Sequence, residues 1–320
     1  MAFKNSLRMA LRRQAAGIDI GAQAVRIVVL SRSARKAGPV RIECVASQLL
    51  APGAMAGAEI VDRQAVARAL SEAFGNVPQQ CMSAALRCAM AIPGSAAFTA
   101  HVPVHHANGG PHRADASVEP VVMMEAERIT GIERHALAVD WHVDDSPPGP
   151  GAVSIAATAR EHLEARIECA AMAGITLTTV DVEPHAALRA LRHAAAFELE
   201  LDEPYAAIWV GSDGVYGWRL EGETIADEIR YPAPEYACVA DAFRDLAENN
   251  LNACALVGGE TDLLDGVCFS LADIGDVLGC PVLPFDCSTL SDGNVIAHSE
   301  LLHDPASAVA FGLALRGIAQ

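Results

Sequence analysis

Apolar residues along this chain first follow the short spacing of β-strands. From Ala16 onward three β-rich runs, AAGIDIG, VRIVVLS and VRIECVAS, are separated only by a glycine turn at residues 21–24 and by the turn ARKAGP. Short apolar runs joined by tight turns are typical of neighbouring antiparallel strands. The pattern therefore predicts a three-stranded antiparallel meander that begins at Ala16.

Helical spacing comes next in the chain. Val66, Leu70 and Phe74 recur every fourth residue, so they share one face of a helix, and Asp62 before them is a favourable N-cap. Strand-like and helix-like segments then alternate. The pattern predicts further helices over residues 118–129, 161–173 and 184–197, and a buried strand at TLTTVDV.

A second meander starts at Tyr205. The runs YAAIWVG, VYGWRL and TIADEIR are separated by turns at residues 212–214 and at EGE, so the same order of strands and turns occurs twice. Such a repeat without sequence identity predicts a structural duplication. A long helix to about residue 250, the strand ACALVGG, two short helices and a final helix over residues 306–315 complete the predicted elements.

Charge narrows the choice of partners. The net charge of −17 repels phosphate backbones and excludes nucleic acid as the main partner. The exception is a basic start formed by Lys4, Arg8, Arg12 and Arg13. It is either a frayed tail or, with Leu7 and Leu11 one turn apart, a contact for an anionic inner leaflet. No apolar stretch approaches the roughly 20 residues of a spanning helix, so we expect a cytoplasmic protein.

The cysteine and histidine patterns give little support for a metal site. The nine cysteines are an odd number and contain no C-x-x-C pair, and several of them lie in apolar contexts, which favours buried free thiols. His101, His105 and His106 are an alternative metal site, but no carboxylate stands at a fixed spacing from them. Ser95 follows a Pro-Gly turn without an identifiable base, so a turn is the favoured interpretation.

Glycine turns are the first candidates for chemistry. One turn follows the first strand of each meander, and backbone N–H groups in such turns donate to phosphate oxygens. Asp19 ends an apolar strand, and Gly21 lets the backbone approach a ligand closely. Gly258 and Gly259 separate a strand from a helix and leave a flat surface for a planar base. Each motif taken singly also fits an ordinary turn.

Taken together, the segments resemble the PilM family of type IV pilus assembly proteins, which is related to the cell-division protein FtsA. The resemblance is carried by GIDIGAQAVRIVVL, AMAIPGSAAFT, MMEAERIT, the stretch VSIAATAREHLEARIECAAMAGITLTTVDVEPHAAL, LVGGETDLLDG with CPVLPFD, and PASAVAFGLALRG. It implies an α/β, actin-like (ribonuclease H-like) fold with two duplicated lobes, a nucleotide cleft and an inserted subdomain. The implied division is a basic tail over 1–15, a first lobe over 16–200 with the inserted subdomain at about 92–157, and a second lobe over 201–320 whose C-terminal helix returns toward the first.

The resemblance also implies a set of nucleotide-binding residues. In the first phosphate segment, Ala22 and Gln23 replace the usual small hydroxyl residues, and Arg26 replaces a common Lys. Asp19 would lie near the magnesium, and Glu183 would orient a water molecule or cap the helix that begins beside it. The full implied set is Asp19, Gly21, Ala22, Gln23, Arg26, Gly211, Ser212, Gly258 and Gly259.

One position departs from the family pattern in a way that changes the expected chemistry. The second phosphate segment reads IWVGSDG, so Trp209 stands where the family has an Asp, and an indole cannot hold hydrated magnesium. Asp213, four positions later, is a possible substitute or a residue that shapes the hairpin. We therefore expect weak ATP hydrolysis at most, with ATP or ADP and Mg bound as structural ligands or with a vestigial cleft.

The function implied by the resemblance is that of an adaptor. It would capture the N-terminal cytoplasmic tail of PilN in an apolar groove between the first lobe and the inserted subdomain, with gating by ATP, and would associate with the inner membrane through that partner. Pilus motor ATPases are a further implied partner. Two alternatives stay open: an ATP-dependent phosphotransferase of the actin and sugar-kinase group, and a nucleotide-free secretion scaffold like the cytoplasmic part of GspL.

Overall fold

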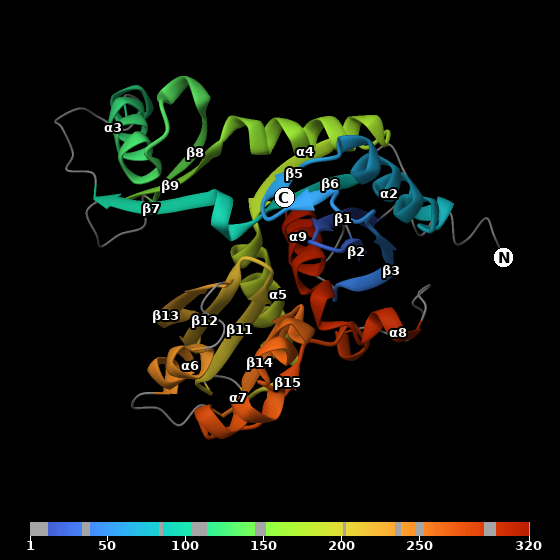
Figure 1. Cartoon of the computed structure of the whole chain (residues 1–320), viewed down its shortest axis with the longest axis vertical. Coiled ribbons are helices and arrows are strands. Elements are labelled where there is room, and N and C mark those ends of the chain that lie inside the picture. The colour runs from blue at the N-terminus through green and yellow to red at the C-terminus, as the bar shows by residue number, and fades with distance from the viewer. Residues whose placement is uncertain are drawn as a thin grey trace.

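The computed structural model describes residues 12–33, 39–82, 86–103, 114–144, 152–200, 203–233, 238–247, 253–290 and 299–319. These residues form two lobes with a smaller subdomain beside the first one (Figure 1). The basic residues Lys4 and Arg8, the paired leucines near them, and His105 and His106 lie outside the described residues.

The first lobe is built on a five-stranded sheet in the order β10-β6-β1-β2-β3. Its antiparallel meander comprises β1 (Arg12–Ile20), β2 (Ala24–Ser33) and β3 (Arg41–Leu49), and β6 (Arg87–Ile92) and β10 (Leu177–Val182) run parallel to β1. One face packs against α2 (Arg63–Gly75) and α4 (Arg160–Met172). The predicted meander is therefore confirmed.

The second lobe repeats this order with other strands. Its sheet runs β13-β12-β11-β14-β15, formed by β11 (Tyr205–Gly211), β12 (Gly214–Glu221), β13 (Thr224–Pro232), β14 (Ala255–Gly259) and β15 (Val282–Pro284). One face packs against α6 (Val239–Ala247) and α7 (Leu271–Leu278). Both sheets thus place an antiparallel meander beside parallel strands, which confirms the predicted duplication.

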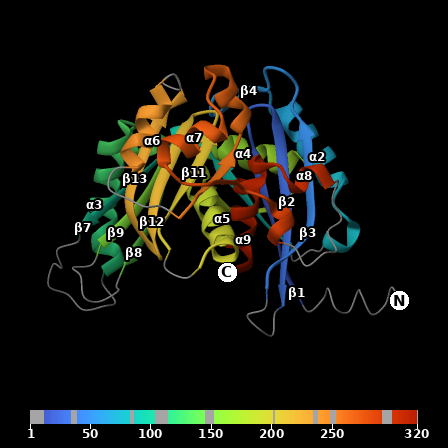
Figure 2. The ribbon, with the colours of Figure 1, turned by 90° about the horizontal axis from the view of Figure 1, so that it is seen from below.

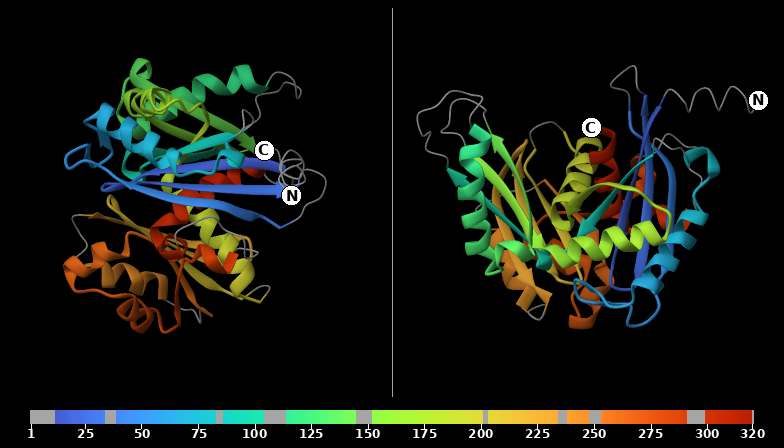
Figure 3. Two further views of the ribbon diagram at one scale, coloured as in Figure 1. Left: turned by 90° about the vertical axis from the view of Figure 1, so that its right-hand side faces the viewer. Right: turned by 90° about the horizontal axis from the view of Figure 1, so that it is seen from above.

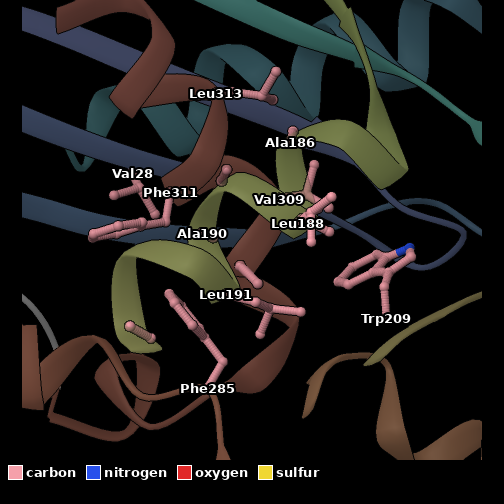
Figure 4. Close-up of a cluster of buried hydrophobic side chains, with 14 of the residues drawn as sticks. Val28, Ala186, Leu188, Ala190, Leu191, Trp209, Phe285, Val309, Phe311 and Leu313 are labelled. Atoms are coloured by element: carbon pink, nitrogen blue, oxygen red, sulfur yellow. The ribbon is translucent and has the colours of Figure 1, made fainter. Parts of the chain in front are cut away.

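Two helices fill the space between the lobes. Figure 2 shows α5 (Glu183–Glu198) and α9 (Ala308–Ala319) side by side between the two sheets. Their side chains belong to one core cluster that includes residues of both sheets, part of which Figure 4 shows. A Cβ placed on Gly312 would lie 1.8 Å from the Ala186 carbonyl oxygen, so only glycine lets α9 cross α5 at this distance.

The subdomain between β6 and α4 has its own sheet and helix. Strands β7 (Ala97–Pro103), β9 (Ala152–Ala159) and β8 (Leu137–Asp144) form an antiparallel sheet in that order. Helix α3 (Ala114–Thr130) covers one face with Val118, Val122 and Ala126. The right-hand view of Figure 3 shows this unit and the meander β1–β3 on opposite sides of the molecule, with α4 running between them.

The remaining elements are short. They are β4 (Met55–Ala56), β5 (Glu59–Ile60), α8 (Ser299–Leu302) and short 3₁₀ helices at Gln79–Cys81, Gly94–Ala96, Arg134–Ala136, Thr261–Val267, Cys287–Leu290 and Pro305–Ser307. Asp62 caps α2 as predicted, since its side chain accepts a hydrogen bond from the Ala65 N–H at 2.9 Å. Seven cysteines are buried free thiols, whereas Cys238 and Cys268 are exposed.

Two predictions about strands need correction. Strand β1 begins at Arg12 rather than Ala16, because Arg12 pairs with Ser33 and its guanidinium donates to the Ser31 hydroxyl at 2.7 Å. Strand β10 was expected to be buried, but it is the edge strand of its sheet and only Asp181 in it is fully buried. Among the described residues, no helix is long and apolar enough to cross a membrane.

Candidate functional site

Both glycine turns lie at the interface between the lobes, which is the place of the predicted nucleotide cleft. Residues 21–23 join β1 to β2, and Ser212 and Asp213 join β11 to β12. Glu183, at the start of α5, feels the charges of both Asp19 and Asp213, which belong to the two meanders. Ala22, Gln23 and Ser212 are exposed. The structure therefore brings the predicted turns together around the first turn of α5.

Arg26 is the centre of the charge network in this cleft. Its Nη1 lies 3.1 Å from Glu260 Oε1 and 3.8 Å from Asp19 Oδ2, and its Nε lies 3.6 Å from Asp304 Oδ2. Glu260 directly follows β14 and Asp304 directly precedes the turn into α9, where it accepts a hydrogen bond from the Ala306 N–H at 3.0 Å. One guanidinium therefore joins the first lobe to two segments of the C-terminal half.

Burial changes the protonation of the carboxyl groups here. Burial raises the pKa of Asp19 from 3.8 to about 7, although the charge of Arg26 lowers it. The pKa of Glu183 lies well above its usual value, first because of burial and then because of Asp19, Asp213 and Glu260. Burial alone would lower the pKa of Arg26, but its carboxylate neighbours outweigh that effect and raise it.

A second buried arginine was not found from the sequence. Arg166 of α4 is fully buried, and it donates to the carbonyls of Ala91 at 2.9 Å, His162 at 3.0 Å and Ala58 at 3.3 Å. Burial lowers its pKa to about 10, and the charges of Glu183 and Asp19 act against that shift. The available signal was that Arg166 lies on a helix face whose other buried residues are small and apolar. Helical spacing does not show that backbone carbonyls would surround its guanidinium.

The second turn is engaged with the first lobe. Asp213 Oδ2 accepts hydrogen bonds from the Ser95 N–H at 2.6 Å and from the Tyr216 hydroxyl at 3.0 Å. Arg230 lies 5.3 Å from the Tyr216 ring centroid and donates to the Gly94 carbonyl at 3.3 Å. Ser95 therefore contributes a backbone donor in a turn, as predicted, and Asp213 does more than shape its own hairpin.

Trp209 stands at the position where the resemblance implies a metal-binding carboxylate. Its side chain is 1% exposed and belongs to the core around α5, where Figure 4 shows it beside Leu188. A Cβ on Gly211 would lie 2.9 Å from the indole Nε1, so the ring packs directly on the turn. The indole N–H has no hydrogen-bond partner among the described residues.

Packing requires glycine at position 259 and leaves little room for a side chain at Gly258. A Cβ on Gly258 would lie 3.0 Å from the Ala308 Cβ, and one on Gly259 would lie 2.0 Å from the Val210 carbonyl oxygen. Gly259 also has a φ of +110°, which L side chains rarely adopt. Their placement next to the cleft agrees with the expected adenosine segment, while a base-binding role stays a prediction.

These residues fit a magnesium nucleotide poorly. A Cβ on Gly21 would lie 2.9 Å from both Arg26 Nη1 and Glu260 Oε1, so an ion pair already covers the glycine that should approach phosphate. Trp209 supplies no metal ligand, and three acidic side chains surround the guanidinium of Arg26. Among the described residues, no cluster of three or more histidine, cysteine or carboxylate side chains could hold a metal ion.

A separate groove lies on the open face of the inserted sheet. It has a volume of about 360 Å³, and its opposite wall comes from the end of β10, the start of α5 and the end of α9. Cross-strand registers place small or polar residues on this face in three rows: Ala97, Thr158 and Ala138; Thr99, Ala156 and Asp140; His101, Ser154 and His142. Each row of the floor therefore has a polar side chain, and the row at one end is polar throughout.

The opposite wall of the groove is held in place by an ion-pair cluster. Asp181 of β10 binds Arg189 at 3.0 Å and Arg316 at 2.7 Å. Burial alone would raise the pKa of Asp181, but the two arginines lower it. His185 completes this wall, and burial lowers its pKa, so it is neutral at physiological pH. These contacts tie the groove to both helices between the lobes.

Duplicated sheets around a shared cleft define an actin-like fold, and this is the class to which the molecule belongs. A family model described as type IV pilus assembly protein PilM matches residues 17–203, which is more than half of the chain. The chain belongs to the PilM family.

Solved structures include similar folds. The PilM-PilN type IV pilus biogenesis complex is similar with a TM-score of 0.70 and 19% identity, over 95% of this chain and 98% of that chain. The ethanolamine utilization protein EutJ from Carboxydothermus hydrogenoformans has a TM-score of 0.46 and 15% identity, over 94% and 89%. The cytoplasmic domain of EpsL, from the type II secretion system of Vibrio cholerae, has a TM-score of 0.45 and 9% identity, over 96% and 94%.

Proposed function

We propose that this protein is a cytoplasmic adaptor of the type IV pilus inner-membrane complex, and that it binds the N-terminal tail of PilN in the groove between the inserted sheet and the first lobe. The observation that carries the proposal is the open face of the sheet β7-β9-β8. Helix α3 covers one face of this sheet with apolar side chains, and the other face lines the groove.

The dimensions of the groove suit an extended segment. Ala97, Ala156 and Ala138 give its floor little height, so a peptide backbone can lie close to the sheet, and Ile92, Val180 and Val182 offer apolar contacts along the wall. His101, whose Nδ1 lies 2.9 Å from the Ser154 hydroxyl, adds a polar group at one end. A tail with alternating apolar side chains and a polar group at one end matches this lining.

The family and the fold support the same partner. The chain belongs to the PilM family, and its fold resembles that of a PilM–PilN complex. In this proposal PilN holds the protein at the inner membrane, and pilus motor ATPases bind elsewhere on it. ATP is left out of the docking step because the cleft between the lobes fits a magnesium nucleotide poorly.

The proposal is tested by titrating a fluorescent peptide of the PilN tail. We expect saturable binding with a dissociation constant below about 10 µM. Ala156→Trp fills the middle of the floor and should weaken binding by at least about tenfold, a loss of about 1.4 kcal/mol. The matched control is Ala226→Trp, which places the same ring on an exposed strand residue of the second lobe and should change nothing.

Two results would remove the adaptor proposal. One is that the wild-type protein does not bind the peptide at a peptide concentration of about 50 µM. The other is equal binding by Ala156→Trp and the wild-type protein, with circular dichroism showing that the variant is folded. Either outcome would show that the groove is not the docking site for this tail.

A further inference from the structure

The space over the first glycine turn is taken by a side chain of the second lobe. Glu260 reaches from the end of β14 toward the first lobe, and a Cβ placed on Gly21 would lie 2.9 Å from its Oε1. Backbone at such a turn is built to face an anion. Here the anion at the turn is the carboxylate of Glu260, held in position by Arg26 at 3.1 Å.

A second carboxylate of the second lobe, that of Asp213, makes a similar contact. Asp213 reaches from the second lobe to the N–H of Ser95, which belongs to the turn before β7 in the first lobe. A Cβ on Gly94 in that turn would lie 2.2 Å from the Tyr216 hydroxyl oxygen, so the turn and the hairpin are in close contact. Both carboxylates therefore belong to the second lobe, and each covers a backbone turn on the first-lobe side.

The charge balance leaves little room for a further anion. Asp19, Asp213 and Glu260 each raise the pKa of Glu183, and Asp19 and Glu260 share Arg26, whereas Arg166 uses its guanidinium on backbone carbonyls. A nucleotide brings several negative charges, and it would have to displace Glu260 from Arg26 before reaching Gly21. Repulsion between the phosphate charges and these carboxylates opposes the displacement of Glu260 unless a metal ion neutralises the charges.

We propose that Glu260 and Asp213 hold the two lobes together in the place of a nucleotide, so that the closed cleft is a property of the chain alone. In actin-like proteins a bound nucleotide contacts both lobes, and its mass action stabilises the closed form. Here the equivalent contacts are intramolecular and need no ligand. The groove of the inserted subdomain is then formed at all times, independent of ATP.

Hydrogen–deuterium exchange of the full chain tests the interlobe role of the two carboxylates. Glu260→Ala should speed exchange in residues 21–24 and 258–260 by at least about threefold, and Asp213→Ala should do the same in residues 94–96, because opening of the cleft exposes these amides. The control is Asp227→Ala, which removes an exposed carboxylate that pairs with Arg219 within the second lobe. Exchange in all these segments should stay unchanged in that variant.

The nucleotide arm uses the wild-type protein with ATP and Mg²⁺, and with ADP and Mg²⁺. We expect no saturable heat in calorimetry and a change in Tm below about 1 °C at nucleotide concentrations of about 2 mM. Glu260→Gln, which keeps the shape and loses the charge, replaces Glu260→Ala if that variant does not fold. Its expected exchange in residues 21–24 is also faster than in the wild-type protein.

The possible outcomes separate clearly. Faster exchange in both carboxylate variants together with no nucleotide binding supports the proposal. Saturable binding of either nucleotide by the wild-type protein overturns it, and so does wild-type exchange in the Glu260 and Asp213 variants. Because no arm uses the PilN tail, a failure here is distinct from a failure of the adaptor proposal.

Discussion

Removal of the Arg26 side chain is the sharpest test of the charge network between the lobes. The guanidinium is 13% exposed, and its partners Asp19, Glu260 and Asp304 have side chains that are 4%, 12% and 33% exposed. Breaking a buried ion pair by removing one partner costs about 3–5 kcal/mol, since the other charge stays buried. Because Asp304 is partly solvated, we expect Arg26→Ala to lower the free energy of unfolding by about 3 kcal/mol at pH 8.

The loss of stability caused by Arg26→Ala should be larger at pH 8 than at pH 6. The pKa of Asp19 is raised from 3.8 to about 7, so the folded state binds the proton more tightly and wild-type stability falls as the pH rises through this window. Without Arg26 the pKa of Asp19 rises further, and each added unit costs about 1.4 kcal/mol above the new pKa. At pH 6 Asp19 is mostly neutral in both proteins, so the loss should shrink to about 1–2 kcal/mol.

Urea unfolding at pH 6 and pH 8, followed by tryptophan fluorescence, measures the loss in the free energy of unfolding and its dependence on pH. The control is Arg63→Ala, because Arg63 and its partner Glu168 are 46% and 54% exposed and such a pair contributes at most about 1 kcal/mol. An Arg26→Ala loss below about 1 kcal/mol, or a loss that is equal at the two pH values, would refute the reasoning, since it would mean that water already solvates Asp19.

Three further substitutions test packing and capping. Gly312→Ala should destabilise the protein by about 1–3 kcal/mol or more, because its Cβ would meet the Ala186 carbonyl oxygen at 1.8 Å, whereas Gly266→Ala has open space and should be neutral in the same thermal melts. Trp209→Asp restores the carboxylate of the family pattern at a site that is 1% exposed, so a phosphate-release assay should show no ATP turnover above background and Tm should fall. Asp62→Ala removes the cap of α2 and should cost about 1 kcal/mol in urea unfolding, and an unchanged midpoint would contradict the role of its hydrogen bond to Ala65.

Local patterns were sufficient for most of the elements. Alternation and tight turns placed both meanders, and the spacing of Val66, Leu70 and Phe74 placed α2, because strands and helices have fixed side-chain periods that a sequence displays directly. The pattern was less informative about position within a sheet. The segment that forms β10 was predicted to be a buried strand, yet β10 lies at the edge of its sheet and, within the described residues, pairs with β6 alone.

The candidate sites were predictable to different extents. Asp19, Gly21 and the later glycine pair stood out because a carboxylate or a glycine at a strand end is visible in any single sequence. Glu260, Asp304 and Arg166 did not, since nothing local distinguishes them from surface charges. Trp209 could be recognised as a departure from the family pattern, but its burial against α5 depends on residues far away in the chain.

The period of apolar residues, the turn residues and the family motifs were thus enough to establish the elements, the duplication and the actin-like fold, because each is encoded within a few neighbouring positions. Which charges meet was decided by the packing of α5 and α9 between the lobes. That packing brings Arg26 to Glu260, 234 positions away, and leaves one face of the inserted sheet open as a groove. Interactions between residues so far apart depend on how whole elements pack, and no local sequence pattern records that.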